Sequence, residues 1–166
     1  MKLTDASGNA LAKKTVTFTV NGINYQATTD SNGGATIMLA LKDAKTYDLT
    51  VSFNGDEVYT SVTKTVKVKL NKEKTNVNAP KKTFKKSKKV KKVDITLKDS
   101  KGKAISNKKV TLKVNKKTYT AKTNKKGKAT FNVKKLNKKG TEKYTVEFAG
   151  DTQYKACKKT GKIRIN

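Results

Sequence analysis

The chain has 166 residues, with 40 Lys and Arg against 12 Asp and Glu, a formal net charge of +28, no His and one Cys. Without His the usual catalytic base and metal ligand is missing, and a single Cys cannot form an intrachain disulfide. The sequence has no run of about 18 apolar residues, so we expect no membrane insertion. We also expect no catalytic residue, no metal site and no cofactor.

The chain contains an internal repeat. Residues 3–41 align with residues 97–135, and residues 47–70 with residues 142–165, giving 24 identical residues in 63 pairs. The repeat predicts two domains, at residues 1–74 and 75–166, joined by a polar linker near residues 71–82 that holds the only proline, Pro80.

The two repeats differ greatly in charge. Residues 1–74 hold 10 Lys and 7 acidic residues, a net charge of +3, whereas residues 75–166 hold 30 Lys and Arg and 5 acidic residues, a net charge of +25. The second repeat therefore combines the apolar pattern of the first with a lysine-rich surface.

Alternating apolar and polar residues predict short β-strands in both repeats. In residues 15–20, Val16, Phe18 and Val20 share one face and three threonines share the other. Further strands are expected at 25–29, 35–41, 47–53 and 58–70, and in repeat two at 109–114, 119–123, 129–136, 144–148 and 154–165. No helical period is present. We therefore expect an all-β chain of two tandem immunoglobulin-like antiparallel β-sandwich domains.

Repeat two has an additional opening segment, expected as a strand at 83–91 leading into 93–97, for which repeat one has no counterpart. We expect repeat one to lack its first strand and to expose a sheet edge, with strand swapping at that edge of an otherwise monomeric chain. Adding upstream residues should then raise the melting temperature of repeat one.

The pattern F-x-G-D-x-x-Y occurs at residues 53–59 and 148–154. We expect its members to shape a turn: Gly55 and Gly150 by tolerating positive φ, Asp56 and Asp151 by accepting backbone hydrogen bonds, and Tyr59 and Tyr154 by forming a tyrosine corner. Cation ligation by the aspartates is disfavoured because calcium needs six or more oxygens and no acidic cluster accompanies them.

Two further chemistries are weighed from single residues. Cys157 aligns with Val62, which favours a buried thiol acting as a small apolar residue over a reactive thiol or an intermolecular disulfide. A Lys–Asn amide cross-link would need an acidic residue on the core face. Glu147 and Asp94 are flanked by apolar residues and are expected to point outward, so such a cross-link is not favoured.

The turn pattern, the D-x-x-G starts at Asp5 and Asp99, and the T-x-x-x-G-x-A-T stretches at Thr29 and Thr123 resemble bacterial immunoglobulin-like (Big-type) repeats. The nearest similarity is to adhesin-like surface proteins of methanogenic archaea. The resemblance implies secretion, tandem arrays that form stalks at the cell surface, and adhesion to the cell wall or to another cell.

Three explanations compete for the lysine-rich repeat. The first is codon bias, which would have raised the lysine content of both repeats; a spacer without a ligand remains as an alternative. The second is nucleic-acid binding. Base-specific recognition prefers Arg, of which Arg164 is the only example, so nonspecific nucleic-acid binding remains as an alternative. The third explanation is docking on an anionic cell-wall or surface glycan through many weak contacts. The lysines expected to bind it are Lys81, Lys82, Lys85, Lys86, Lys88, Lys89, Lys91, Lys92, Lys116, Lys117, Lys125, Lys126, Lys138 and Lys139.

Overall fold

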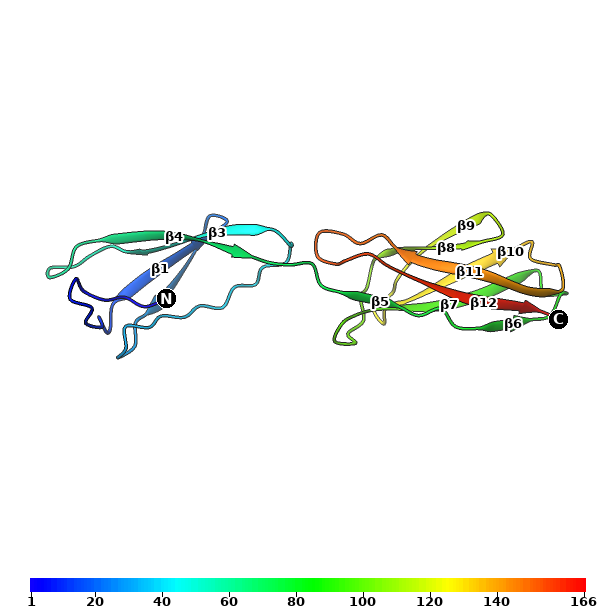
Figure 1. Ribbon diagram of the computed structural model, residues 1–166, viewed down its shortest axis with the longest axis horizontal. Helices are drawn as coiled ribbons and strands as arrows, with labels where there is room; N and C mark the ends of the chain where they lie inside the picture. Colours follow the sequence, from blue (N-terminus) through cyan, green and yellow to red (C-terminus); the bar gives the residue numbers. More distant parts are fainter. The chain divides into compact units, whose positions relative to one another are not determined.

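A computed structural model describes residues 1–166, which contain strands, turns and coil but no helix. The chain divides into two compact units, residues 1–71 and 72–166 (Figure 1). Below, these are called unit 1 and unit 2. The all-β class is confirmed. No helix capable of spanning a membrane is found.

Unit 1 is built on one antiparallel sheet. Its strands are β1 (Thr15–Val20), β2 (Ile23–Thr28), β3 (Thr46–Phe53) and β4 (Val62–Lys69), in the order β2-β1-β3-β4. A two-residue turn joins β1 to β2, with positive φ at both Asn21 and Gly22, as the right-handed twist of a hairpin requires. The buried core is small and consists of Leu3, Leu11, Val16, Phe18, Ala35 and Phe53.

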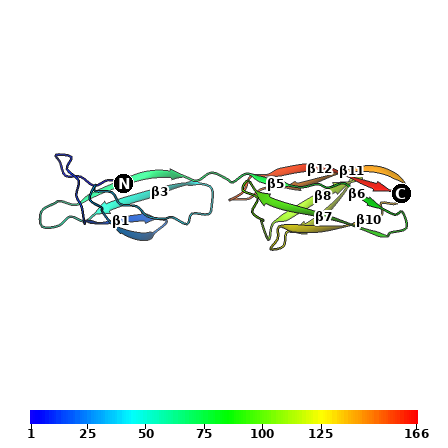
Figure 2. The same ribbon diagram turned by 90° about the horizontal axis from the view of Figure 1, so that it is seen from below.

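Unit 2 is a two-layer sandwich, which Figure 2 shows with the layers above one another. The strands are β5 (Thr75–Val77), β6 (Lys82–Phe84), β7 (Val90–Asp99), β8 (Lys109–Val114), β9 (Lys117–Lys122), β10 (Lys128–Lys134), β11 (Gly140–Phe148) and β12 (Cys157–Ile165). One sheet has the order β10-β7-β5, and the other β6-β12-β11-β8-β9. All pairs are antiparallel except β6 with β12, which is parallel.

The core of unit 2 lies between these layers. Alternate residues of β7 (Val93, Ile95 and Leu97) are almost completely buried, as are Val110 and Leu112 of β8. Val146 and Ile163 complete the opposite wall. Because β7, β8 and β10 bury every second side chain, the lysines between these buried positions point outward without disturbing the packing.

The predicted linker is part of unit 2. Thr75 and Val77 of β5 are buried, and residues 75–77 pair with residues 97–99 of β7. The stretch from 71 to 82 is therefore not a plain connection, because β5 lies within it and β6 begins at its last residue. The opening strand expected at 83–91 is divided between β6 and β7.

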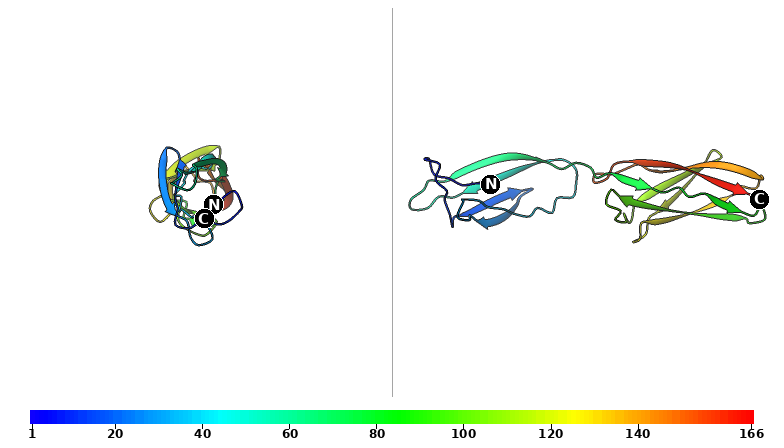
Figure 3. Two further views of the ribbon diagram at one scale, coloured as in Figure 1. Left: turned by 90° about the vertical axis from the view of Figure 1, so that its left-hand side faces the viewer. Right: turned by 60° about the horizontal axis from the view of Figure 1, so that its bottom comes forward.

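The strand predicted at residues 35–41 of unit 1 does not form, and the stretch between β2 and β3 is coil (Figure 3). Its counterpart in unit 2 is β10, which pairs along its whole length with β7. Unit 1 has only isolated bridges in this region, Lys2 with Gly34 and Thr4 with Ala10. An alternating sequence without a hydrogen-bonding partner therefore stays irregular, and the second layer of unit 1 is incomplete.

Candidate polyanion-binding surface

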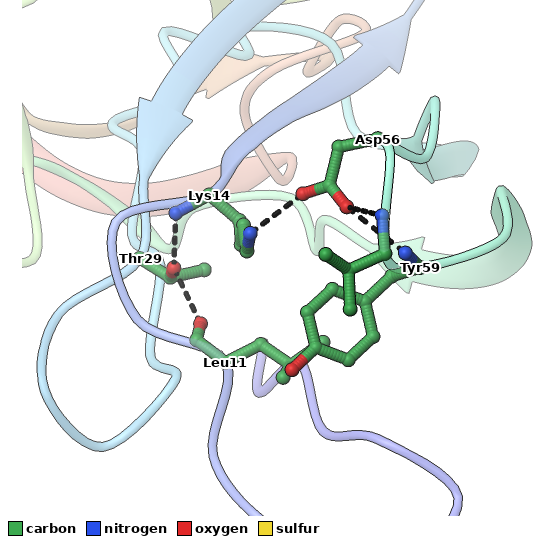
Figure 4. Close-up of polar contacts among 6 residues, drawn as sticks. Leu11, Lys14, Thr29, Asp56 and Tyr59 are labelled. Carbon is green, nitrogen blue, oxygen red and sulfur yellow. Dashed lines mark hydrogen bonds and ion pairs between the residues drawn. The ribbon is translucent and has the colours of Figure 1, made fainter.

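The F-x-G-D-x-x-Y pattern builds the same turn in both units. Figure 4 shows it in unit 1, where one carboxylate oxygen of Asp56 accepts hydrogen bonds from the backbone N–H groups of Val58 and Tyr59. The other oxygen lies 2.6 Å from Lys14 Nζ. The hydrogen bond from Lys14 lowers the pKa of the Asp56 carboxyl below its ordinary value of 3.8.

Unit 2 repeats this arrangement with Lys108 and Asp151, whose charged atoms are also 2.6 Å apart. Asp151 accepts from the N–H groups of Gln153 and Tyr154. Partial burial raises the pKa of this carboxyl, but the hydrogen bonds from Lys108 and the turn outweigh the burial, so the pKa is lowered overall. Asp56 and Asp151 therefore have the geometry of turn residues.

Glycine is required at the start of this turn. Gly55 and Gly150 both have φ of +81°. A Cβ at Gly55 would lie 2.8 Å from the carbonyl oxygen of Tyr59, and one at Gly150 2.8 Å from the amide nitrogen of Ala156. Both the backbone conformation and the close approach of the chain exclude larger residues here.

The tyrosines of the pattern have a different role from the one expected. Lys14 Nζ lies 5.0 Å from the ring centre of Tyr59, and Lys108 Nζ lies 5.3 Å from that of Tyr154. Each ring therefore makes a cation–π contact with the lysine of the ion pair. The bond typical of a tyrosine corner is instead made by Tyr47, whose hydroxyl donates to the carbonyl of Asp43, four residues earlier.

The remaining single-residue expectations concern Cys157, Glu147 and Asp94. Cys157 is a free thiol that is half-buried rather than fully buried, and it packs against the core of unit 2 as an apolar residue. Glu147 pairs with Lys113 at 3.3 Å and Asp94 with Lys128 at 3.0 Å, on the outer faces of their strands. Their outward orientation, inferred from the alternation, is confirmed.

The expectation that Lys91 binds a polymer is wrong. Lys91 is 0% exposed, and its ammonium donates to the carbonyl of Lys88 at 2.6 Å and lies 3.5 Å from Asn137 Oδ1. The sequence did carry the signal: Lys91 has the same strand parity as Val93, Ile95 and Leu97, which all point inward. A buried ammonium requires hydrogen-bond acceptors, and two neutral oxygens provide them.

The other thirteen are at the surface, twelve exposed and Lys82 half-buried, but they do not form one site. The strand registers place the β6–β7, β8–β9 and β10–β11 connections at one end of unit 2, where Gly140 pairs with Ile165 and Tyr144 with Val114 (Figure 1). Lys125 and Lys126 are in the β9–β10 connection at the opposite end. Lys81, Lys82 and Lys92 lie beside or along β6 and β7.

Ten exposed lysines lie in these three connections or at the strand ends beside them and are called the end cluster: Lys85, Lys86, Lys88, Lys89, Lys116, Lys117, Lys134, Lys135, Lys138 and Lys139. Lys134 and Lys135 were missed by the sequence reasoning, because they fall within the strand expected at 129–136. Their adjacency as a Lys-Lys pair, like the pairs in the other connections, was the available signal.

Hydrogen bonds link the β6–β7 and β10–β11 connections to each other and to neighbouring strands. Lys91 ties the β6–β7 connection to Asn137 in the β10–β11 connection. The hydroxyl of Tyr119, on β9, donates to the carbonyl of Lys134 at 3.0 Å. The N–H of Lys86 donates to the backbone oxygen of Asn166, just beyond β12. The basic loops are therefore held at defined positions.

None of the ten end-cluster lysines forms an ion pair. The acidic residues that do pair in unit 2, Asp94, Glu147 and Asp151, bind lysines elsewhere. Within the cluster, a hollow of about 460 Å³ is lined by Lys86, Ser87, Lys89, Val90, Lys134, Lys135 and Asn137. Four lysines and no acidic residue line this hollow, so it attracts anions.

No protein-family model and no curated protein matches the sequence. Similar solved structures exist. One is the crystal structure of invasin, described as a bacterial integrin-binding protein (TM-score 0.62, 16% identity, 99% of this chain and 34% of that chain). Another is a tetra-tandem repeat from the extending region of a large adhesion protein (TM-score 0.54, 13% identity, 95% and 43%).

A calcium-stabilised adhesin that helps an Antarctic bacterium bind ice also aligns, with a TM-score of 0.36 and 20% identity over 96% of this chain and 42% of that chain. The chain spans between a third and a half of these three structures. At these identities the similarity establishes the fold: tandem immunoglobulin-like repeats of the kind found in invasin and in the large adhesion protein.

Proposed function

We propose that this chain is a non-enzymatic, extracellular module of a surface adhesin or stalk, and that unit 2 docks on an anionic cell-wall or surface glycan. The likeness to repeats of invasin and of a large adhesion protein supports the adhesin part. The same proposal includes a relationship to archaeal adhesin-like repeats and contact of the chain with a second cell.

The observation that carries the docking part is the end cluster. Ten lysines without ion pairs lie in or beside three connections at one end of unit 2, and hydrogen bonds link the β6–β7 and β10–β11 connections. A polymer with one negative charge per repeat unit can contact several of these loops at once, and weak contacts then add along the chain. Lysine suits such a partner because its mobile point charge needs no fixed ligand geometry.

Unit 1 provides the internal reference. It has the same strand order over its sheet as β9-β8-β11-β12 of unit 2, yet residues 1–71 hold 8 Lys against 6 acidic residues, a net charge of +2, while residues 72–166 carry +26. A stalk that only separates domains needs no such difference. We therefore assign the spacing role to the common fold and the docking role to the added charge.

The experiment compares two variants of the full chain with equal loss of charge. The end variant replaces Lys86, Lys89, Lys116, Lys117, Lys138 and Lys139 by Gln, and the matched control replaces Lys101, Lys103, Lys125, Lys126, Lys155 and Lys158, which are exposed in connections and strand starts at the opposite end. Binding is measured to poly(glycerol phosphate), to polygalacturonate and to double-stranded DNA over a salt series.

We expect the end variant to lose about tenfold or more of its affinity for one of the two polymers at low salt, and to show a smaller dependence on salt, because fewer counterions are released. The control should lose about threefold or less. Equal losses would show attraction by net charge alone and would contradict a defined docking surface. Tighter binding to DNA than to either polymer would favour the nucleic-acid alternative.

A further inference from the structure

Unit 1 contains an apolar groove that its own residues do not fill. The groove has a volume of about 600 Å³ and is lined by Met1, Lys2, Leu3, Thr4, Phe18, Leu49, Val51, Phe53, Val62, Lys64 and Val66. Val62 is 50% exposed and Val66 40% exposed, both on β4 at the edge of the sheet. A contiguous, concave apolar surface of this kind is typical of a place that another chain segment or a ligand covers.

The second unit shows what covers the equivalent surface. There Tyr144 and Val146, the counterparts of Leu49 and Val51, are fully buried. The side chains that pack with them include Val77, Phe84 and Val93, which belong to β5, β6 and the first half of β7. These strands precede residue 95, the position that aligns with Met1, so residues 1–71 include no counterpart of them.

The backbone beside the groove is prepared for a strand. The N–H of Ala35 donates to the carbonyl of Met1, and the amine of Met1 donates to the carbonyl of Ala35, both at 3.0 Å. This is the register of Ile95 with Ala129 in unit 2, where the ladder continues through residues 90–94. In unit 1 the ladder stops at Met1, and residues 36–40 stay without a partner strand.

We propose that this groove is the seat of a β-strand joined to Met1 on its N-terminal side, which runs antiparallel to residues 36–40 and inserts an apolar side chain at every second position. Residues 36–40 retain the matching alternation, with Ile37 and Leu39 half-buried between exposed neighbours. The strand would convert residues 35–40 into a paired strand and close the second layer, in the manner of β-strand addition.

The test fuses a copy of residues 72–94 directly in front of Met1 of the full chain, so that the copied residue 94 precedes Met1 as residue 94 precedes Ile95. We expect hydrogen exchange of the amides of residues 36–40 to slow by about tenfold or more, because the new ladder protects them. The melting temperature of unit 1 should rise by roughly 5 °C or more. Amide signals of β3 and β4 report on unit 1 alone.

The matched control carries the same extension with Val77→Ser and Val93→Ser in the copied segment, which keeps the backbone but removes the apolar contacts. It should show little protection and little rise in melting temperature. The proposal is overturned if the apolar extension protects residues 36–40 no better than the control does. It is also overturned if the unfused chain forms a dimer that protects this groove, since a second copy would then be the occupant.

Discussion

Units 1 and 2 have the same plan and 24 identical residues in 63 aligned pairs, yet only unit 2 has a closed sandwich. Residues 35–40 and the counterpart strand β10 both alternate apolar and polar side chains. β10 pairs with β7, while residues 35–40 have no strand to pair with and remain coil. Strand formation in this fold therefore depends on a partner as well as on the local sequence.

The cores of the two units differ by compensating changes. In unit 2, Tyr144 pairs with Gly161 across β11 and β12, and in unit 1 the equivalent pair is Leu49 with Val66. A large ring beside glycine stands where unit 1 has two medium side chains, which line its open groove. The comparison suggests four tests, presented from the largest expected effect to the smallest.

The largest effect is expected for Gly161→Val. A Cβ at this position would lie 2.4 Å from Cζ of Tyr144, so the ring would have to move within a closed core. Unit 2 should lose about 3 kcal/mol of unfolding free energy. Urea unfolding, followed by unit 2 amide signals, measures it.

Two variants control this result. The double variant Gly161→Val with Tyr144→Leu copies the unit 1 pair and should recover much of the loss, as a coupling energy of about 1–3 kcal/mol between neighbours predicts. Val66→Gly in the open unit 1 should cost only about 1 kcal/mol. If the double variant is no more stable than the single one, the steric explanation is wrong.

The second test uses alkaline pH. Burial raises the pKa of Tyr144 from 10.0 to about 12, and its hydroxyl donates to the carbonyl of Pro80 at 2.6 Å. The pKa of Tyr144 is higher in the folded than in the unfolded state. The contribution of its protonated hydroxyl to the unfolding free energy is therefore complete below pH 10 and is lost as the pH rises towards 12, by on the order of 2 kcal/mol.

The measurement is unfolding of unit 2 by urea at several pH values between 8 and 12. Tyr144→Phe is the control: it retains every lysine, so the difference between the two pH profiles isolates the phenol. Unit 1, with Leu49 at this position, should not show this contribution. Parallel profiles for the wild type and the Phe variant would contradict the assignment.

The third test removes the turn carboxylates. Asp56→Ala and Asp151→Ala each leave two turn N–H groups and one lysine without an acceptor. Asp151→Ala should cost about 1–2 kcal/mol of the unfolding free energy of unit 2, and Asp56→Ala should lower the melting temperature of unit 1. Asp→Asn should cost less, since the amide oxygen still accepts from the turn. Thermal unfolding of both pairs of variants measures the difference.

Acid pH tests the same turn without mutation. The pKa values of Asp56 and Asp151 are lowered by folding, so their contribution is complete above pH 3.8 and is lost as the pH falls through the lower folded values. Both Asp→Asn variants should reduce the loss of stability below pH 4. A variant with an unchanged acid profile would show that the turn does not depend on the charge.

The smallest effect is expected for Lys67→Ala. Lys67 and Asp48 are 2.8 Å apart on β4 and β3, but both side chains are largely exposed, and water screens the pair. The change in unfolding free energy should be below about 0.5 kcal/mol. A much larger loss would show that the exposed face of unit 1 contributes to the stability of its incomplete core.

The sequence was sufficient for features set by local chemistry. The alternation at residues 15–20 and 109–114 gave β1 and β8 with their observed bounds, and the G-D pairs marked both turns. Features that depend on tertiary pairing were less accessible. Residues 35–41 had the pattern of a strand without its partner, and residues 75–77 had a polar composition but a buried position.

The candidate surface shows the same division. Lysine pairs in the connections were visible in the sequence, but which connections meet depends on strand order and register. Lys125 and Lys126 are at the opposite end of unit 2 from Lys116, Lys117, Lys138 and Lys139, a separation that no sequence spacing reveals. Lys91 lies within a run of lysines and was grouped with them, although strand parity places it with the inward-facing residues.

The parallel pairing of β6 with β12 has a mechanical consequence. β6 is entered from the N-terminal side of unit 2, and β12 leads to its C-terminal side, with Lys82, Thr83 and Phe84 beside Ile163, Arg164 and Ile165. Tension on the two ends pulls these parallel strands past each other, so the hydrogen bonds between them are strained together rather than opened one after another. Unit 2 therefore has a shear geometry, in which these hydrogen bonds must break together when the unit is stretched.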